Sequence, residues 1–97
     1  MDTSQDPRGD TDLRPQVGFR LKAGAYDPTS FFDLIRGRGL SYHDLMLFDA
    51  VNGEVPGVVR FDWDVASTVV DATADWLRSL PFVLNVFPNH GGRIRAV

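Results

Sequence analysis

The chain contains no cysteine among its 97 residues. Disulfide bonds, thiolate nucleophiles and zinc sites built on sulfur are therefore excluded. The two histidines, His43 and His90, lie far apart and lack a metal-ligand spacing such as H-x-x-x-H. We therefore predict neither a metal site nor a cofactor.

Long apolar runs are also missing. No stretch approaches the ~20 apolar residues that span a bilayer, and the polar N-terminus has no signal-peptide core. We therefore expect no membrane partner and take the cytoplasm as the default location. The length is that of one domain.

An excess of positive charge is absent too, because the formal net charge is −3. Nucleic-acid-binding domains usually carry a basic footprint, so we expect no nucleic-acid partner. Catalytic constellations are equally scarce. Asp62 and Asp64 are the nearest approach to a carboxylate pair, but Asp64 is better explained as a helix cap, so we predict no catalytic residue.

The polar segment 1–15 has almost no apolar residues and is predicted to be a flexible arm, with a single domain over residues 16–97. Val17, Phe19 and Leu21 then alternate with polar residues and glycine, which predicts a strand with one buried face.

Asp27 and Pro28 predict the start of a helix, as N-cap and first helical residue. Its apolar face contains Phe31, Leu34 and Ile35, and Gly37 or Gly39 is expected to end it. A second strand is expected from about Ser41 to Val51.

Asn52-Gly53 predicts a turn, which we extend through residues 54–57 as a longer hairpin connection. In the third strand we expect Val59, Phe61 and Trp63 to face the core. Asp64 is the predicted cap of a second helix ended by Pro81, and a fourth strand is expected over residues 82–87.

This order of elements predicts a ferredoxin-like βαββαβ sandwich of the α+β class, with two helices on one face of an antiparallel sheet. The first and third strands should be central. The open face should then carry Arg20, Lys22, Arg60 and Asp62, either as a solvated, salt-bridged surface or as a cationic floor for an anionic ligand.

Three stretches carry a resemblance to a known family: Asp27–Phe31 (DPTSF), Arg38–Leu45 (RGLSYHDL) and Trp76–Val86 (WLRSLPFVLNV). The first is placed like the Asp-x-Pro-Gly-x-Leu loop of the ACT domain family, and the second is similar to that family's Arg-Gly-Phe-Asn-Ile-Glu-Ser-Leu. The third resembles its Leu-x-x-Leu-x-x-Val-x-x-Val ending. ACT domains are small ferredoxin-like modules that sense amino acids.

The resemblance implies a regulatory or ligand-binding module that acts as a homodimer or as a subunit of a larger metabolic enzyme, with an amino acid or another small anion as allosteric effector. The chain departs from the family where the loop glycine is Thr29 and the contacting asparagine is Ser41, so we expect weak binding. The implied ligand-binding residues are Ala25, Tyr26, Asp27, Thr29, Ser30, Ser41, Tyr42 and His43.

Two other functions stay open. One is a small dimeric ferredoxin-like enzyme that holds a hydrophobic substrate between sheet and helices, with Tyr26, His43, Trp63 and His90 as candidate groups. The other is an adaptor that binds a peptide along an exposed edge strand. A homodimer is expected because residues 45–48 are apolar on both sides of a strand that we expect at the sheet edge.

Overall fold

The computed structural model describes residues 12–93, so residues 1–11 of the predicted arm and residues 94–97 lie outside it. The elements in chain order are β1 (Asp12–Leu13), β2 (Gln16–Lys22), α2 (Pro28–Gly37), β3 (Asp44–Leu47), β4 (Glu54–Arg60), α3 (Ser67–Arg78), β5 (Val83–Asn89) and β6 (Gly92–Arg93).

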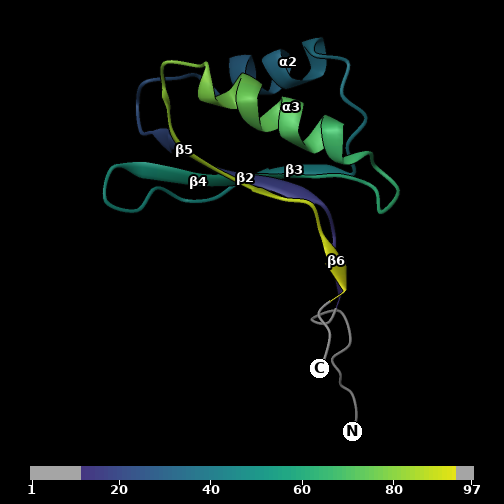
Figure 1. The fold of residues 1–97 in the computed structure, drawn as a ribbon. Helices are drawn as coiled ribbons and strands as arrows, with labels where there is room; N and C mark the ends of the chain where they lie inside the picture. The colour runs from purple at the N-terminus through teal and green to yellow at the C-terminus, as the bar shows by residue number, and fades with distance from the viewer. Residues whose placement is uncertain (1–11, 94–97) are drawn as a thin grey trace, which may run out of the picture.

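The main sheet has four antiparallel strands in the order β3-β4-β2-β5. Both helices lie on one face of it, and the opposite face carries no helix (Figure 1). This is the ferredoxin-like α+β fold that the sequence predicts, with β2 and β4 at the centre. Within residues 12–93, no helix is long and apolar enough to cross a membrane.

The core lies between the sheet and the helices. Val17, Phe19 and Leu21 of β2 are buried as predicted, because alternate strand residues point to the same face. Val55, Val59 and Phe61 complete the sheet side of this buried core, to which α2 contributes Phe31 and Ile35. From α3 the buried side chains are Val70, Thr73, Ala74 and Leu77.

Several predicted details are wrong. Trp63 is 52% exposed, because β4 ends at Arg60 and the chain turns before the alternation reaches Trp63. Leu34 is 43% exposed on the outer side of α2. Asp64 does not cap α3, whose N-cap is Ala66 without a side-chain hydrogen bond. The strand β3 covers only Asp44–Leu47.

The turn at Asn52-Gly53 is confirmed, with both residues at positive φ, but residues 54–57 belong to β4 and not to the connection. Pro56 fits inside this central strand because its carbonyl accepts from the amide of Phe48, on the side where β3 has already ended. The amide that proline lacks would point the same way, so few ladder hydrogen bonds are lost.

Within the described residues, structure begins before Gln16. β1 pairs with β6 as a two-stranded ribbon that leaves the end of the main sheet (Figure 1). Pro15 is buried and its carbonyl accepts from the Phe61 amide at 2.9 Å. Arg14 donates to the Phe61 carbonyl at 3.2 Å. Arg14 and Pro15, which the sequence assigns to the arm, thus both contact Phe61.

Candidate functional site

The loop before α2 contains the first group of predicted ligand-binding residues. Its helix start is capped by the chain itself: a carboxylate oxygen of Asp27 accepts from the Ser30 amide at 2.9 Å, and the Asp27 carbonyl accepts from the Phe31 amide at 2.8 Å. A ligand carboxylate would compete with these bonds and would meet the negative charge of Asp27. Ala25 and Thr29 are exposed beside this cap.

Tyr26 in the same loop serves the core. Its ring stacks on Phe82 with centroids 5.8 Å apart and meets the edge of Phe31 at 6.1 Å. Burial raises the pKa of the Tyr26 hydroxyl above its ordinary value. The side chain is thus held by packing rather than presented to a ligand.

The second predicted group lies at the other end of the sheet. The His43 amide donates to the Arg60 carbonyl, and Arg60 pairs with Gln16 at the beginning of β2. The Ala25 amide bonds to Lys22 at the end of the same strand. Because β2 rises by about 3.3 Å per residue, the groups lie roughly 20 Å apart. One chain therefore does not bring them together.

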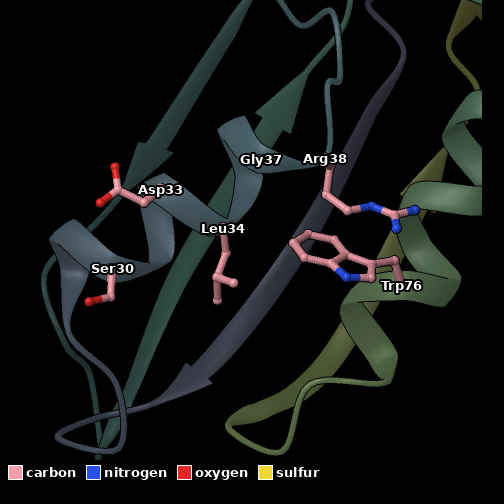
Figure 2. Close-up of a pocket in the computed structure, with 6 residues that line it drawn as sticks. All are labelled: Ser30, Asp33, Leu34, Gly37, Arg38 and Trp76. Atoms are coloured by element: carbon pink, nitrogen blue, oxygen red, sulfur yellow. The ribbon is translucent and has the colours of Figure 1, made fainter.

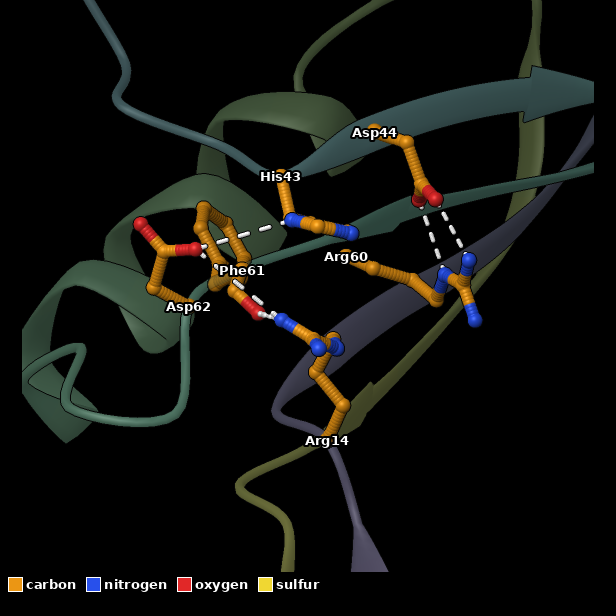
Figure 3. Close-up of polar contacts among 6 residues, drawn as sticks. All are labelled: Arg14, His43, Asp44, Arg60, Phe61 and Asp62. Atoms are coloured by element: carbon orange, nitrogen blue, oxygen red, sulfur yellow. Dashed lines mark hydrogen bonds and ion pairs between the residues drawn. The ribbon is translucent and has the colours of Figure 1, made fainter. Parts of the chain in front are cut away.

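Within that second group, Ser41 is exposed, Tyr42 is half-buried against the core and His43 is exposed. His43 belongs to a polar cluster at the end of the sheet (Figure 3). Its Nδ1 lies 3.7 Å from a carboxylate oxygen of Asp62, which also lies 3.9 Å from Arg14.

The strongest ion pair of this polar cluster joins β3 to β4. Arg60 donates two hydrogen bonds to the two carboxylate oxygens of Asp44, one of them at 2.8 Å from Nε (Figure 3). These bonds, helped by the positive charges of Arg60 and Arg14, hold the pKa of Asp44 below its ordinary value of 3.8 despite partial desolvation. The same bonds raise the pKa of Arg60.

These contacts bear on the predicted cationic floor. Arg60 is neutralised by Asp44, and Arg20 lies 3.5 Å from Glu54. Lys22 stands directly opposite Glu54 in the ladder. The open face therefore matches the salt-bridged alternative better than the cationic one.

A groove of about 560 Å³ is lined by residues of α2, by Arg38 and by Trp76 of α3. Arg38, just after α2, places its guanidinium 5.0 Å from the ring centroid of Trp76 on α3 (Figure 2). Leu34 projects from α2 beside them. The lining residues are Ser30, Asp33, Leu34, Gly37, Arg38 and Trp76.

Arg38 is the cation of this groove. Asp33 pairs instead with Arg36 at 2.5 Å, and its carboxylate points away from Trp76 (Figure 2). Within residues 12–93, no carboxylate forms an ion pair with Arg38. A guanidinium beside an apolar floor can hold the carboxylate of a ligand whose body covers the indole.

Sequence reasoning found one residue of this groove, Ser30, among the predicted ligand-binding residues. It missed Arg38 and Trp76 as a pair because the two residues, one just after α2 and the other in α3, lie 38 positions apart in the sequence. A signal existed in the spacing of Ser30, Leu34 and Arg38, which repeats every four residues and places them along one side of α2.

Tyr26 does not meet the other candidate groups of the enzyme hypothesis, whereas His43 and Trp63 both lie at the polar cluster of Arg14 and Asp62. Tyr26 lies at one end of the sheet, and His43 lies at the other. His90 pairs with Asp71 of α3 at 2.7 Å, and Trp63 stacks against Arg14 with a guanidinium-to-centroid distance of 5.1 Å. The space between sheet and helices, where that hypothesis places a substrate, is filled by fully buried side chains such as Phe19.

The chain matches no known family model, no curated protein and no solved structure. The class that the fold defines is a single ferredoxin-like α+β domain, and the resemblance to ACT domains stays a prediction drawn from the sequence.

Proposed function

We propose that the protein is a regulatory, ligand-binding module whose effector is a small carboxylate with an apolar body. The single observation that carries this proposal is the exposed guanidinium of Arg38 lying on the indole of Trp76, inside a groove between the two helices. As the resemblance to ACT domains implies, the module would act as a dimer or as a subunit of a larger metabolic enzyme.

The chemistry of the groove supports this class of ligand. Arg38 offers paired N–H donors that match a carboxylate, whereas Trp76 and Leu34 offer apolar surface for the rest of the molecule. The volume lies within the range of small-molecule sites, about 300–1,000 Å³. Amino acids with aliphatic or aromatic side chains are members of this class.

The proposed site differs from the loop before α2, where the resemblance to ACT domains implies a ligand. At the loop, the Asp27 carboxylate already accepts the hydrogen bond of the Ser30 amide, and its negative charge repels an anion. At the groove, the positive charge of Arg38 attracts an anion. Because the groove is open to water, binding should be modest. We expect dissociation constants nearer millimolar than micromolar, corresponding to about −4 kcal/mol.

Tryptophan fluorescence tests the proposal, since the chain has two tryptophans. Trp63→Phe leaves Trp76 as the only indole, and this protein is titrated with leucine and phenylalanine. The amines that lack only the carboxylate, isoamylamine and phenethylamine, serve as matched ligands. We expect a saturable change with the two amino acids and none with the amines.

Two arginine variants control for general charge effects. Arg38→Gln should weaken binding at least tenfold, or about 1.4 kcal/mol. Arg78→Gln removes the same charge from the exposed end of α3, at an ion pair whose two residues do not line the groove, and should leave binding unchanged. Equal binding of acids and amines, or equal effects of the two variants, would contradict the proposal.

A further inference from the structure

The sheet face opposite the helices carries a continuous apolar row. Ladder pairing aligns one residue from each strand across it: Met46 of β3, Val58 of β4, Gly18 of β2 and Phe87 of β5. Phe87 is 51% exposed, as is Phe48, which follows Met46 on the same face. Large apolar side chains gathered on one face indicate a docking surface.

Charges flank this row on both sides: Arg60 and Asp44, which pair with each other, lie toward one end of the strands, and the Lys22 and Glu54 pair lies toward the other. Lys22 of β2 and Glu54 of β4 are directly opposite each other in the ladder. Arg20, one step closer to the row, reaches Glu54 at 3.5 Å and lies over the Phe87 ring at 5.7 Å. The face is thus an apolar strip with both charge signs side by side.

We infer that this face docks a second copy of the chain, about a two-fold axis that runs parallel to the strands and between β2 and β4. Take any residue of β4 and its ladder partner in β2. Such an axis places this β4 residue of one copy over the same β2 residue in the other copy. It places β3 of one copy over β5 of the other in the same way.

The pairs that this axis creates are complementary. Glu54 of each copy faces Lys22 of the other, so two ion pairs form at the end of the interface. In the middle, Val58 faces the hollow left by Gly18, and Met46 faces Phe87. Pro56 faces the stem of Arg20, and no like charges oppose each other on the two central strands.

The alternative two-fold axis, perpendicular to the strands along the apolar row, is much less favourable. It would set Pro56 over the charged Arg60 and Phe48 over Asp44, burying charges against apolar groups. It would also direct Lys22 toward Arg14. Charge complementarity therefore selects both the occupant, a second copy, and its orientation.

Sedimentation velocity of the full chain and of two charge reversals tests this interface. We expect the wild type to be a dimer at high micromolar concentration. Lys22→Glu and Glu54→Lys each set like charges against each other in the dimer and should weaken it at least about tenfold. A 1:1 mixture of the two variants restores both ion pairs and should recover the dimer.

Matched reversals on α3 control for net charge. Arg78→Glu and Asp75→Lys change the charge by the same amounts at an exposed ion pair on the helix side. Each should dimerise like the wild type. Because ladder neighbours also affect folding, circular dichroism melts of all four variants establish that they are folded at the temperature used.

A third variant avoids charge altogether. A Cβ at Gly18 meets nothing closer than 3.8 Å, so Gly18→Leu should fit in the folded monomer while it fills the hollow that Val58 of the second copy needs. We expect this variant to dissociate at least about tenfold more readily. A monomeric wild type, or a dimer that tolerates Gly18→Leu and both charge reversals, would overturn the inference.

Discussion

The ring of Phe19 lies directly against the backbone of Gly57, its ladder partner on the neighbouring central strand. A Cβ atom at position 57 would stand 2.7 Å from Cζ of Phe19 and 2.8 Å from Cδ2 of Leu47. Phe19 is only 1% exposed and has no room to move away. The core is therefore built around the absence of a side chain at Gly57.

Gly57→Ala should accordingly destabilise the fold by about 1–3 kcal/mol through overpacking. Gly18→Ala is the matched control, because Gly18 lies in β2 with its nearest Cβ neighbours at 3.8 Å on the open face. That control should change the free energy of unfolding by less than about 0.5 kcal/mol. Urea denaturation measures both, and equal losses would contradict the packing described.

The exposure of Trp63 leads to a second prediction. Trp63→Ala removes a half-exposed ring and its contact with Arg14, so we expect a loss of about 0.5–1 kcal/mol. Phe61→Ala, two residues earlier, empties a fully buried site and should cost about 3–5 kcal/mol. If urea melts show Trp63→Ala to be the more damaging, the end of β4 is wrongly placed.

The two helix starts differ in a way that stability measurements can detect. Asp27→Ala removes the side-chain cap of α2 and should cost about 1 kcal/mol. Asp64→Ala should cost less than about 0.5 kcal/mol, since Asp64 does not cap α3. Ala66→Ser supplies the missing cap and should stabilise the protein by about 0.5–1 kcal/mol.

The Asp44–Arg60 ion pair predicts a dependence of stability on pH. The folded state lowers the pKa of Asp44, so between the folded and unfolded values the unfolded chain binds more protons. The contribution is therefore fully present above the ordinary value of 3.8 and is lost as the pH falls through the folded value.

Chemical denaturation at a series of pH values checks this dependence. Asp44→Asn should be less stable than the wild type at neutral pH, and the difference should shrink as the pH falls below about 4. Arg60→Gln should behave alike, and the double variant should lose little more than either single one. A difference that is constant with pH would exclude Asp44 as its source.

The architecture was predictable because its signals are local. The alternation of Val17, Phe19 and Leu21 gives β2 its buried face, and Asp27-Pro28 begins α2 whatever the rest of the chain does. Residues 54–57 were misassigned because Pro56-Gly57 resembles a turn. Only the ladder shows that Pro56 faces the end of β3 and that Gly57 makes room for Phe19.

The candidate site was much less predictable, because its residues meet only in the folded chain. Ser30 was found from its place near the helix start. Arg38 follows α2 and Trp76 lies in α3, and nothing in either local sequence indicates their contact. Conversely, the resemblance to ACT domains assigns the loop before α2 and residues 41–43 to one site. In the fold, these two segments lie at opposite ends of β2.

The most direct test of the proposed function is a ¹H–¹⁵N NMR titration of the full chain with phenylalanine. We predict saturable shifts of the Trp76 indole N–H and of the Gly37 and Arg38 amides, and smaller or no shifts at Ala25 and Tyr26. Shifts confined to the loop before α2 or to residues 41–43, or no saturable shift at all, would contradict a carboxylate site between the helices.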